Sequence, residues 1–384
     1  MHIPDGYLSP ATCAAGLVVA LPTLAVAAKR VQSTVKTRNV PTLAMLAAVS
    51  FLVMMFNIPI PDGTTAHAVG GVLIAILLGP WAAVIAVSVA LLFQALLFGD
   101  GGVLAYGVNV VNMAIILPFV GYAVYRVVAG GSMLTSRRRV AAAFLGGYVG
   151  INAAALATAI ELGVQPDLFH TAAGVPLYSP YHLSQTIPTM MLAHLLVAGV
   201  VEGILTAGTV AYLQRANLPL LQINHPGVRL DDADVASGRG RRIRPGLVAV
   251  GAVLLMVVLT PLGLLAPGGA FGEDAPGALK LDSLGLSSVP AGMAKYTGFW
   301  HHALFNGYDF ANNDHPWIGY VLSAVVGILA IGLVVFVLGW VLRRLTGGRP
   351  SRADGGEVVD VREATAGAQA RSDSEAERDE TVSR

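Results

Sequence analysis

The chain opens with the decapeptide MHIPDGYLSP, whose first two residues carry groups that can bind a metal ion. The free amine of Met1, the amide nitrogen of His2 and the His2 imidazole can close a five-membered and a six-membered chelate ring around one ion. Planar nitrogen sites of this kind suit Ni(II) or Cu(II), and one position in the plane stays open. The alternative is an ordinary solvated N-terminus, and the decapeptide alone leaves both interpretations open.

Two features of the decapeptide favour a free amine on Met1. The segment has neither a basic region nor an apolar core, so it lacks the pattern of a signal peptide. The enzyme that removes initiator methionine requires a small second residue, and His2 is not small. We therefore expect Met1 to be retained next to His2.

The tetrapeptide IPDG of residues 3–6 recurs at residues 60–63, and His67 follows the second copy. Proline fixes φ and glycine accepts a positive φ, so both copies favour tight turns. Each turn lies near one histidine, and His67 can supply the fourth nitrogen if both turns lie on one face of the protein. Otherwise they are two unrelated turns between helices, so the topology must decide.

Composition places these turns in a membrane protein. Of the 384 residues, 55% are hydrophobic and 12% are charged, whereas about one quarter of a soluble domain is charged. Nine hydrophobic segments are candidates to cross a bilayer, which takes a helix of roughly 20 residues. They cover residues 11–28, 40–56, 66–78, 81–98, 108–128, 140–160, 187–213, 247–265 and 318–342. The sequence thus predicts an all-α polytopic membrane protein.

Basic residues predict how these segments are oriented. Clusters follow segments one, five, seven and nine, at Lys29-Arg30, Arg137 to Arg139, Arg239 to Arg244 and Arg343-Arg344. Lysine and arginine favour the cytoplasmic side, which predicts an N-terminus outside and a C-terminus in the cytoplasm. The loop at residues 57–66 then also lies outside, so His2 and His67 share the outer face. This argument is independent of the chelate and favours His67 as its fourth nitrogen.

Polar residues inside the hydrophobic segments need partners. Asn109 and Asn112 lie on one helix face, and they either bond to neighbouring helices or support the metal ligands. His194 and Glu202 lie on roughly one face of the seventh segment, and a structural hydrogen bond is the better account of both.

Other outer-side groups are weaker candidates for metal binding. Adjacent residues rarely face the same ion, so we expect His301-His302 to act at most in gathering metal weakly. The remaining candidates are Asp167, His170, His182, Asp309, Asp314 and His315.

Several function classes find no support in the sequence. A net charge of +1 gives no sign of nucleic-acid binding. The single cysteine, Cys13, excludes an internal disulfide and a cysteine-rich metal site. The chain has no Gly-x-x-x-x-Gly-Lys-Ser/Thr pattern and no recognisable frame for a catalytic nucleophile. It therefore lacks ATPase motifs, and active transport would need energy from elsewhere.

Residues 1–215 resemble the cobalt/nickel substrate-binding membrane component, the M component (CbiM/NikM family), of energy-coupling factor transporters. The motifs that carry the resemblance are the opening decapeptide, Asn57-Ile58-Pro59 with Gly63-Thr64 and His67, the segment QALLFGDGG at 94–102, and Asn109 with Asn112. Residues 246–345 are similar to the two-span N component, joined to M by a cytoplasmic linker at 216–245. Its usual Pro-Asp-Gly-Leu-Glu turn is replaced by TPLGL at 260–264. A cytoplasmic tail at 346–384 is expected to be disordered.

The resemblance implies a seven-helix M unit plus two C-terminal transmembrane helices in a prokaryotic cell membrane. It implies Ni(II) or Co(II) as the transported substrate, held by Met1, His2 and His67. The residues expected to support these ligands are Asp5, Thr64, Asn109 and Asn112. The implied partners are a transmembrane coupling protein and cytoplasmic ATP-binding-cassette ATPases, so the chain would be the non-catalytic, substrate-specific subunit of an ATP-driven importer.

The alternative function is a self-sufficient secondary carrier of transition metals. Such carriers show buried acidic residues at mid-membrane and internal repeats, and here Glu202 is the only strong candidate, with no clear repeat. An intramembrane enzyme is a more distant alternative because no motif supports it. The sequence does not distinguish cobalt from nickel as the substrate, since low-spin Co(II) accepts the planar geometry that favours Ni(II).

Overall fold

The computed structural model describes residues 1–34, 39–60, 64–225, 228, 245–266, 269–310 and 315–345. Residues 1–339 form one compact unit that contains parts of both predicted domains. The tip of the second IPDG turn at 61–63, most of the linker predicted at 216–245, the tail from 346 onward and Asp314 lie outside the described residues. The predicted domain boundaries stay predictions.

Helices dominate the described residues, and each of the nine predicted segments has a helical counterpart. The counterparts are α1 (Pro10–Thr34), α2 (Val40–Met54), α3 (Gly71–Leu78), α4 (Pro80–Phe93) with η2 (Gln94–Phe98), α5 (Tyr106–Asn109) with η3 (Val110–Ile116) and α6 (Leu117–Ala129), α7 (Arg137–Gly163), α9 (Leu183–Ala193) with η4 (His194–Ala198) and α10 (Gly199–Ala216), α13 (Pro245–Leu259) with η5 (Thr260–Leu265), and α15 (Pro316–Leu345). Short helices α8 (Gln165–Leu168), α11 (Leu218–Gln222) and α14 (Ala291–Tyr296) lie between them. Within the described residues, seven helical stretches are long and apolar enough to cross a membrane. The prediction of an all-α polytopic membrane protein is confirmed.

The predicted start of the third segment at residue 66 is wrong. Thr64–Ala66 instead forms β2, which pairs antiparallel with β1, Ile58–Ile60. The backbone then runs without regular structure to Gly70, whose φ of +75° suits glycine, and α3 begins at Gly71. Eight residues rise only about 12 Å, and all eight are buried. The surrounding helices therefore shield α3, which is too short to cross a bilayer alone.

Glu202 of α10 fixes the segment between β2 and α3. Its carboxylate is fully buried and accepts the backbone N–H of Val69 at 2.8 Å and that of Gly70 at 2.9 and 3.1 Å. An anion at the N-terminus of a helix also complements the helix dipole. The predicted structural hydrogen bond of Glu202 is confirmed, and it holds the backbone two and three residues after His67.

Among the described helices, three spans contain a π-helical turn, and each turn carries a buried polar side chain. The turns are η2, η3 and η4, and the buried side chains are Gln94, Asn112 and His194. An extra residue in a helical turn changes which side chains face the interior, and such turns are frequent at functional sites. His194 Nδ1–H donates to the Met190 carbonyl at 2.8 Å, so the predicted structural bond of His194 is also confirmed.

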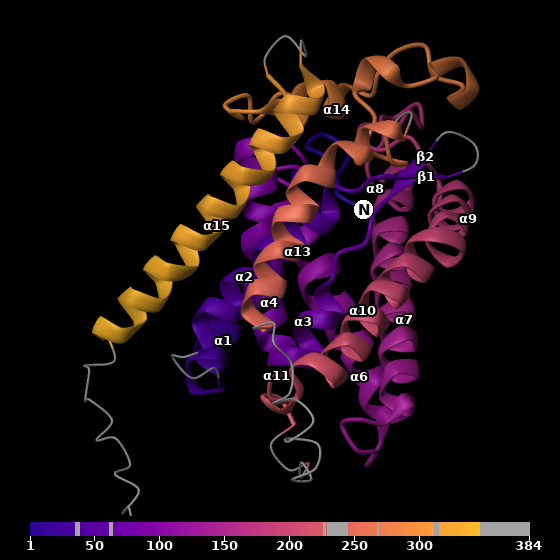
Figure 1. Cartoon of the computed structure of the whole chain (residues 1–384). Helices are drawn as coiled ribbons and strands as arrows, with labels where there is room; N and C mark the ends of the chain where they lie inside the picture. The colour runs from indigo at the N-terminus through magenta and orange to yellow at the C-terminus, as the bar shows by residue number, and fades with distance from the viewer. Residues whose placement is uncertain are drawn as a thin grey trace, which may run out of the picture. The chain divides into compact units, whose positions relative to one another are not determined.

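The connection between α13 and α15 covers the end of the bundle that holds the N-terminus. Figure 1 shows the N-terminus beside β1 and β2, near the connection that carries α14. The Tyr7 hydroxyl donates to the Asp274 carbonyl at 2.8 Å, and Phe305 N–H donates to the Leu97 carbonyl at 3.0 Å. Residues more than 200 positions apart in sequence therefore build one polar region around the first residues of the chain.

Candidate metal-binding site

The first residues of the chain are buried, with Met1, His2 and Ile3 each no more than 3% exposed. Asn109 holds this arm at Ile3: the Ile3 N–H donates to Asn109 Oδ1 at 2.9 Å, and Asn109 Nδ2 donates to the Ile3 carbonyl at 3.1 Å. Gly102 N–H donates to the same carbonyl at 2.8 Å. The interpretation as an ordinary solvated N-terminus is therefore wrong.

Asp5 fixes the turn that follows the arm. Its carboxylate accepts the backbone N–H groups of Val103, Leu104 and Ala105 at 3.1, 2.8 and 3.2 Å. Burial raises the pKa of this carboxyl, and the three N–H donors act in the opposite direction. A side chain at Gly102 would overlap the Asp5 carboxylate, so this arrangement requires glycine at position 102.

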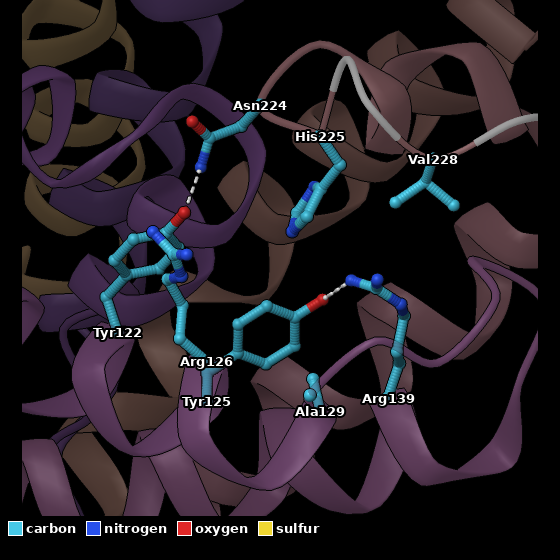
Figure 2. Close-up of a pocket in the computed structure, with 9 residues that line it drawn as sticks. Tyr122, Tyr125, Arg126, Ala129, Arg139, Asn224, His225 and Val228 are labelled. Atoms are coloured by element: carbon cyan, nitrogen blue, oxygen red, sulfur yellow. Dashed lines mark hydrogen bonds between the residues drawn. The ribbon is translucent and has the colours of Figure 1, made fainter.

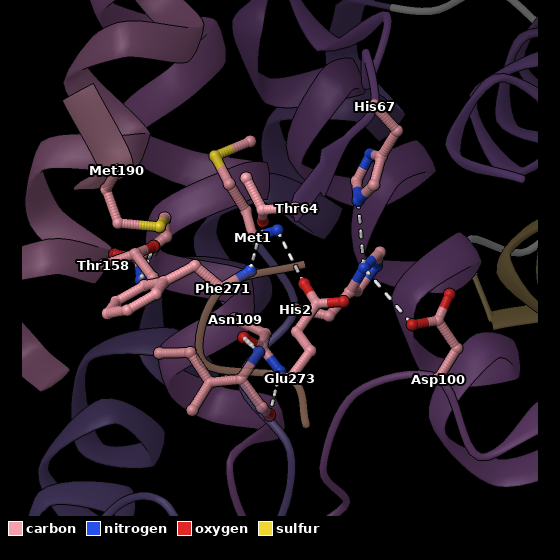
Figure 3. A network of polar contacts seen from close by, with 12 residues as sticks. Met1, His2, Thr64, His67, Asp100, Asn109, Thr158, Met190, Phe271 and Glu273 are labelled. Atoms are coloured by element: carbon pink, nitrogen blue, oxygen red, sulfur yellow. Dashed lines mark hydrogen bonds and ion pairs between the residues drawn. The ribbon is translucent and has the colours of Figure 1, made fainter. Parts of the chain in front are cut away.

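The imidazoles of His2 and His67 face each other inside the protein. His2 Nδ1 and His67 Nε2 lie 3.2 Å apart, and the ring centroids lie 4.8 Å apart. The other nitrogen of each ring is bonded elsewhere: His67 Nδ1–H donates to the Ala68 carbonyl at 3.0 Å, and His2 Nε2–H donates to Gln94 Oε1 at 3.2 Å. These bonds leave a lone pair on each facing nitrogen, so both rings can bind one metal ion placed between them. Figure 3 shows the two rings and Asp100 beside them.

The tautomer of His2 follows from a network around Gln94. Gln94 Nε2 donates to the Tyr308 hydroxyl at 3.0 Å and to Asp100 Oδ2 at 3.3 Å, which turns Gln94 Oε1 toward His2. The Tyr308 hydroxyl donates to Asp100 Oδ2, and Asp100 Oδ1 lies 3.4 Å from His2 Nδ1. Tyr308 has a positive φ of 67°, a strained conformation for a residue other than glycine. A residue of the α13–α15 connection therefore helps to orient His2.

The Met1 amine is ion-paired with Glu273 of the same connection, at 2.8 Å (Figure 3). The backbone amide of His2 has no such partner: its N–H donates to no described residue. The amide that follows it, Ile3 N–H, donates to Asn109. A buried amide hydrogen without a partner is rare in proteins. The amine and this amide are the two nitrogens that the predicted chelate needs next to the His2 ring.

Burial also keeps His67 neutral at ordinary pH. The pKa of His67 lies well below its usual value because the ring is desolvated, and the Met1 amine and His2 add to this effect. A neutral imidazole is the form that binds transition metals.

The remaining predicted residues lie in different places. The Thr64 hydroxyl accepts the Phe271 N–H at 2.9 Å and so ties β2 to the α13–α15 connection. Asn112 instead donates to Thr158 and Glu161, away from the two rings. His301 and His302 are exposed and lie against each other. Exposed His182 lies 3.3 Å from Asp167, and His170 is also at the surface.

Four residues that contact the site have no role predicted from the sequence. Gln94 and Asp100 belong to the QALLFGDGG segment, and Glu273 and Tyr308 belong to the α13–α15 connection. The motif of Gln94 and Asp100 is visible in the sequence, but the contacts of all four residues depend on how that connection folds over the N-terminus. Half-buried Glu161 of α7, which accepts a hydrogen bond from Asn112, also has no role predicted from the sequence.

A family model described as "Cobalt uptake substrate-specific transmembrane region" matches residues 2–220, which is more than half of the chain. The chain belongs to this family. It is thus a membrane protein of cobalt and nickel transport, and the resemblance of residues 1–215 to that family is confirmed.

Relatives extend the match beyond the family region. A fused nickel transport protein of Rhodobacter capsulatus is 46% identical over 343 residues, covering 86% of this chain and 95% of that protein. A probable fused nickel transport protein of Lactiplantibacillus plantarum is 46% identical over 341 residues, covering 87% and 96%. The crystal structure of a truncated transition-metal transporter is 58% identical with a TM-score of 0.52, covering 56% of this chain and 98% of that one. The fusion of an M component to an N component is thereby confirmed.

Proposed function

We propose that this chain is the substrate-specific membrane subunit of an ATP-driven energy-coupling factor importer for Ni(II) or Co(II). The metal would bind to four nitrogens: the Met1 amine, the His2 amide, His2 Nδ1 and His67 Nε2. Relatives that cover most of the chain are named as fused nickel transport proteins, which favours Ni(II) as the substrate.

The observation that carries this proposal is that His2 Nδ1 and His67 Nε2 face each other in the protein interior. Two nitrogens that bind one ion at right angles, each at about 2.0 Å, lie about 2.8 Å apart. His2 Nδ1 and His67 Nε2 are 3.2 Å apart and buried, so a small adjustment brings both to a metal. Their outer nitrogens are already bonded, which orients both rings before the metal arrives.

The α13–α15 connection supports the site from the outside. Glu273 holds the Met1 amine and Tyr308 holds Asp100 beside His2. When the metal binds, it displaces the proton of the amine, and the Glu273 contact loses its cation. The N-component-like region would therefore hold the metal-free arm in place and release the amine to the incoming ion.

An ATP-driven importer and a secondary carrier differ in their source of energy. Glu202, the acidic residue that the carrier hypothesis depends on, accepts two backbone amides at the start of α3 and is occupied structurally. We therefore place the energy source in partner proteins: a transmembrane coupling protein and cytoplasmic ATP-binding-cassette ATPases. The basic clusters at Arg137 to Arg139 and Lys29-Arg30 support a cytoplasmic face at the opposite end from His2, with the N-terminus outside.

Uptake in cells that lack other nickel and cobalt importers tests the function. We expect accumulation of ⁶³Ni(II) or ⁵⁷Co(II) only when the chain is co-produced with a coupling protein and the ATPases, and its loss when the ATPases carry an inactive nucleotide site. Full uptake by the chain alone would support the secondary carrier instead.

The pH dependence of metal binding tests the ligand set. Binding displaces the His2 amide proton and one proton of the Met1 amine, which is held as a cation against Glu273. His67 releases no proton when the metal binds, because its lowered pKa leaves the ring neutral between about pH 6 and 8. Affinity should therefore rise with pH, with a slope of log affinity near two. Calorimetry at several pH values measures this slope, and a slope below one is incompatible with an amide ligand.

A further inference from the structure

A second polar pocket lies at the far end of the same helices from His2. Its volume is about 330 Å³, and its lining includes Arg126, Arg139 and His225. The stretch from Asn109, which binds the N-terminal arm, to Arg126 contains 17 helical steps, or about 25 Å. The pocket and the metal site are therefore near opposite faces of the predicted membrane region.

Arg139 is a buried cation in this pocket. It is 3% exposed, and its guanidinium donates to the Ser132 and Met133 carbonyls and to the Tyr125 hydroxyl. These partners are neutral, and Arg139 pairs with no carboxylate among the described residues. A buried charge without a counter-ion is costly, so Arg139 leaves a positive potential in the pocket.

Arg126 adds a second positive charge to this potential, and His225 lies beside it. Figure 2 shows Arg126, His225 and Arg139 around the ring of Tyr125. His225 Nδ1–H donates to the Leu221 carbonyl at 2.9 Å, which leaves Nε2 free. Burial and the two arginines lower the pKa of His225. Among the described residues, none that lines the pocket is Asp or Glu, so an anion would meet two arginines and no carboxylate.

We propose that this pocket binds a phosphate group, carried by the headgroup of an anionic membrane lipid. Arginine forms strong, paired hydrogen bonds with phosphate oxygens. Basic pockets between transmembrane helices at the cytoplasmic side suit acidic lipid headgroups, and Tyr122 and Tyr125 suit the membrane interface. Arg126, in the last turn of α6, is exposed and can reach the headgroup, while Arg139 supplies the fixed charge.

Lipid binding to the purified, delipidated full chain tests this site. The probes are short-chain phosphatidylglycerol, short-chain phosphatidylcholine and inorganic phosphate, measured by calorimetry and by native mass spectrometry. We expect phosphatidylglycerol to bind at least tenfold more tightly than phosphatidylcholine. Arg126→Gln should weaken that binding about tenfold. The matched control is Arg137→Gln, which removes the same charge from an exposed position outside the pocket and should leave the affinity unchanged.

Each outcome has a defined meaning. Inorganic phosphate could bind as tightly as phosphatidylglycerol, with Arg126→Gln weakening its binding. That result would support a phosphate site but reject a lipid headgroup as the source of the phosphate. Binding of neither anion, or an equal loss in Arg126→Gln and Arg137→Gln, would overturn the proposal. Helical circular dichroism and Ni(II) binding, both expected to be unchanged, confirm that the variants are folded.

Discussion

His67→Ala should abolish metal uptake and lower metal affinity at least tenfold, equivalent to about 1.4 kcal/mol. The change removes the imidazole that faces His2, and alanine offers no nitrogen to the open position in the plane. The backbone should stay in place, because Glu202 holds Val69 and Gly70 independently of the His67 ring. Uptake of radioactive nickel and calorimetry on the purified protein measure the two effects.

The matched control is the double variant His301→Ala/His302→Ala. Both residues are exposed and belong to the α13–α15 connection, so the variant removes two imidazoles without touching the buried pair. We expect uptake to fall much less than in His67→Ala. Equal losses in the two variants would show that the exposed histidines hold the transported ion.

Blocking the N-terminal amine should weaken metal binding by at least the same tenfold factor. A fusion partner ahead of Met1 converts the amine into an amide, which removes one of the four nitrogens and the cation that pairs with Glu273. Met1 is 3% exposed, so the extension must also open the cover over the arm. Affinity is measured by calorimetry before and after cleavage by a protease that leaves Met1 as the first residue.

The cleaved protein serves as the control, because it differs from the fused form only in the N-terminus. Cleavage should restore both the affinity and the pH slope near two. If the fused and cleaved forms bind Ni(II) equally well, the amine is not a ligand and the proposed chelate fails.

The sequence by itself determined the class of the protein and the ligand chemistry it offers. The long apolar segments can hide their backbone polar groups in a bilayer only as helices, so the spans follow from composition. The chemistry of Met1 and His2 is local, because ring sizes in a chelate depend only on adjacent covalent bonds. Both could therefore be predicted without knowing how any two distant segments pack.

The extent of α3 could not be predicted from its apolar residues. The apolar pattern runs from Ala66 to Leu78, but the helix begins only at Gly71. Thr64–Ala66 pairs with Ile58–Ile60, and Glu202, more than 130 residues away, binds the amides of Val69 and Gly70. These long-range contacts override the local preference for a helix, because buried backbone and carboxylate groups must be paired.

The partners of the site residues were decided by the tertiary structure alone. Asn109 and Asn112 share a helix face in the sequence, yet Asn109 binds Ile3 while Asn112 binds Thr158 and Glu161. Glu273 and Tyr308 reach Met1 and Asp100 across more than 200 residues. Such pairings depend on the path of the α13–α15 connection. That path is fixed by many contacts acting together, whereas spacing along the chain reports only on neighbours within one helix or turn.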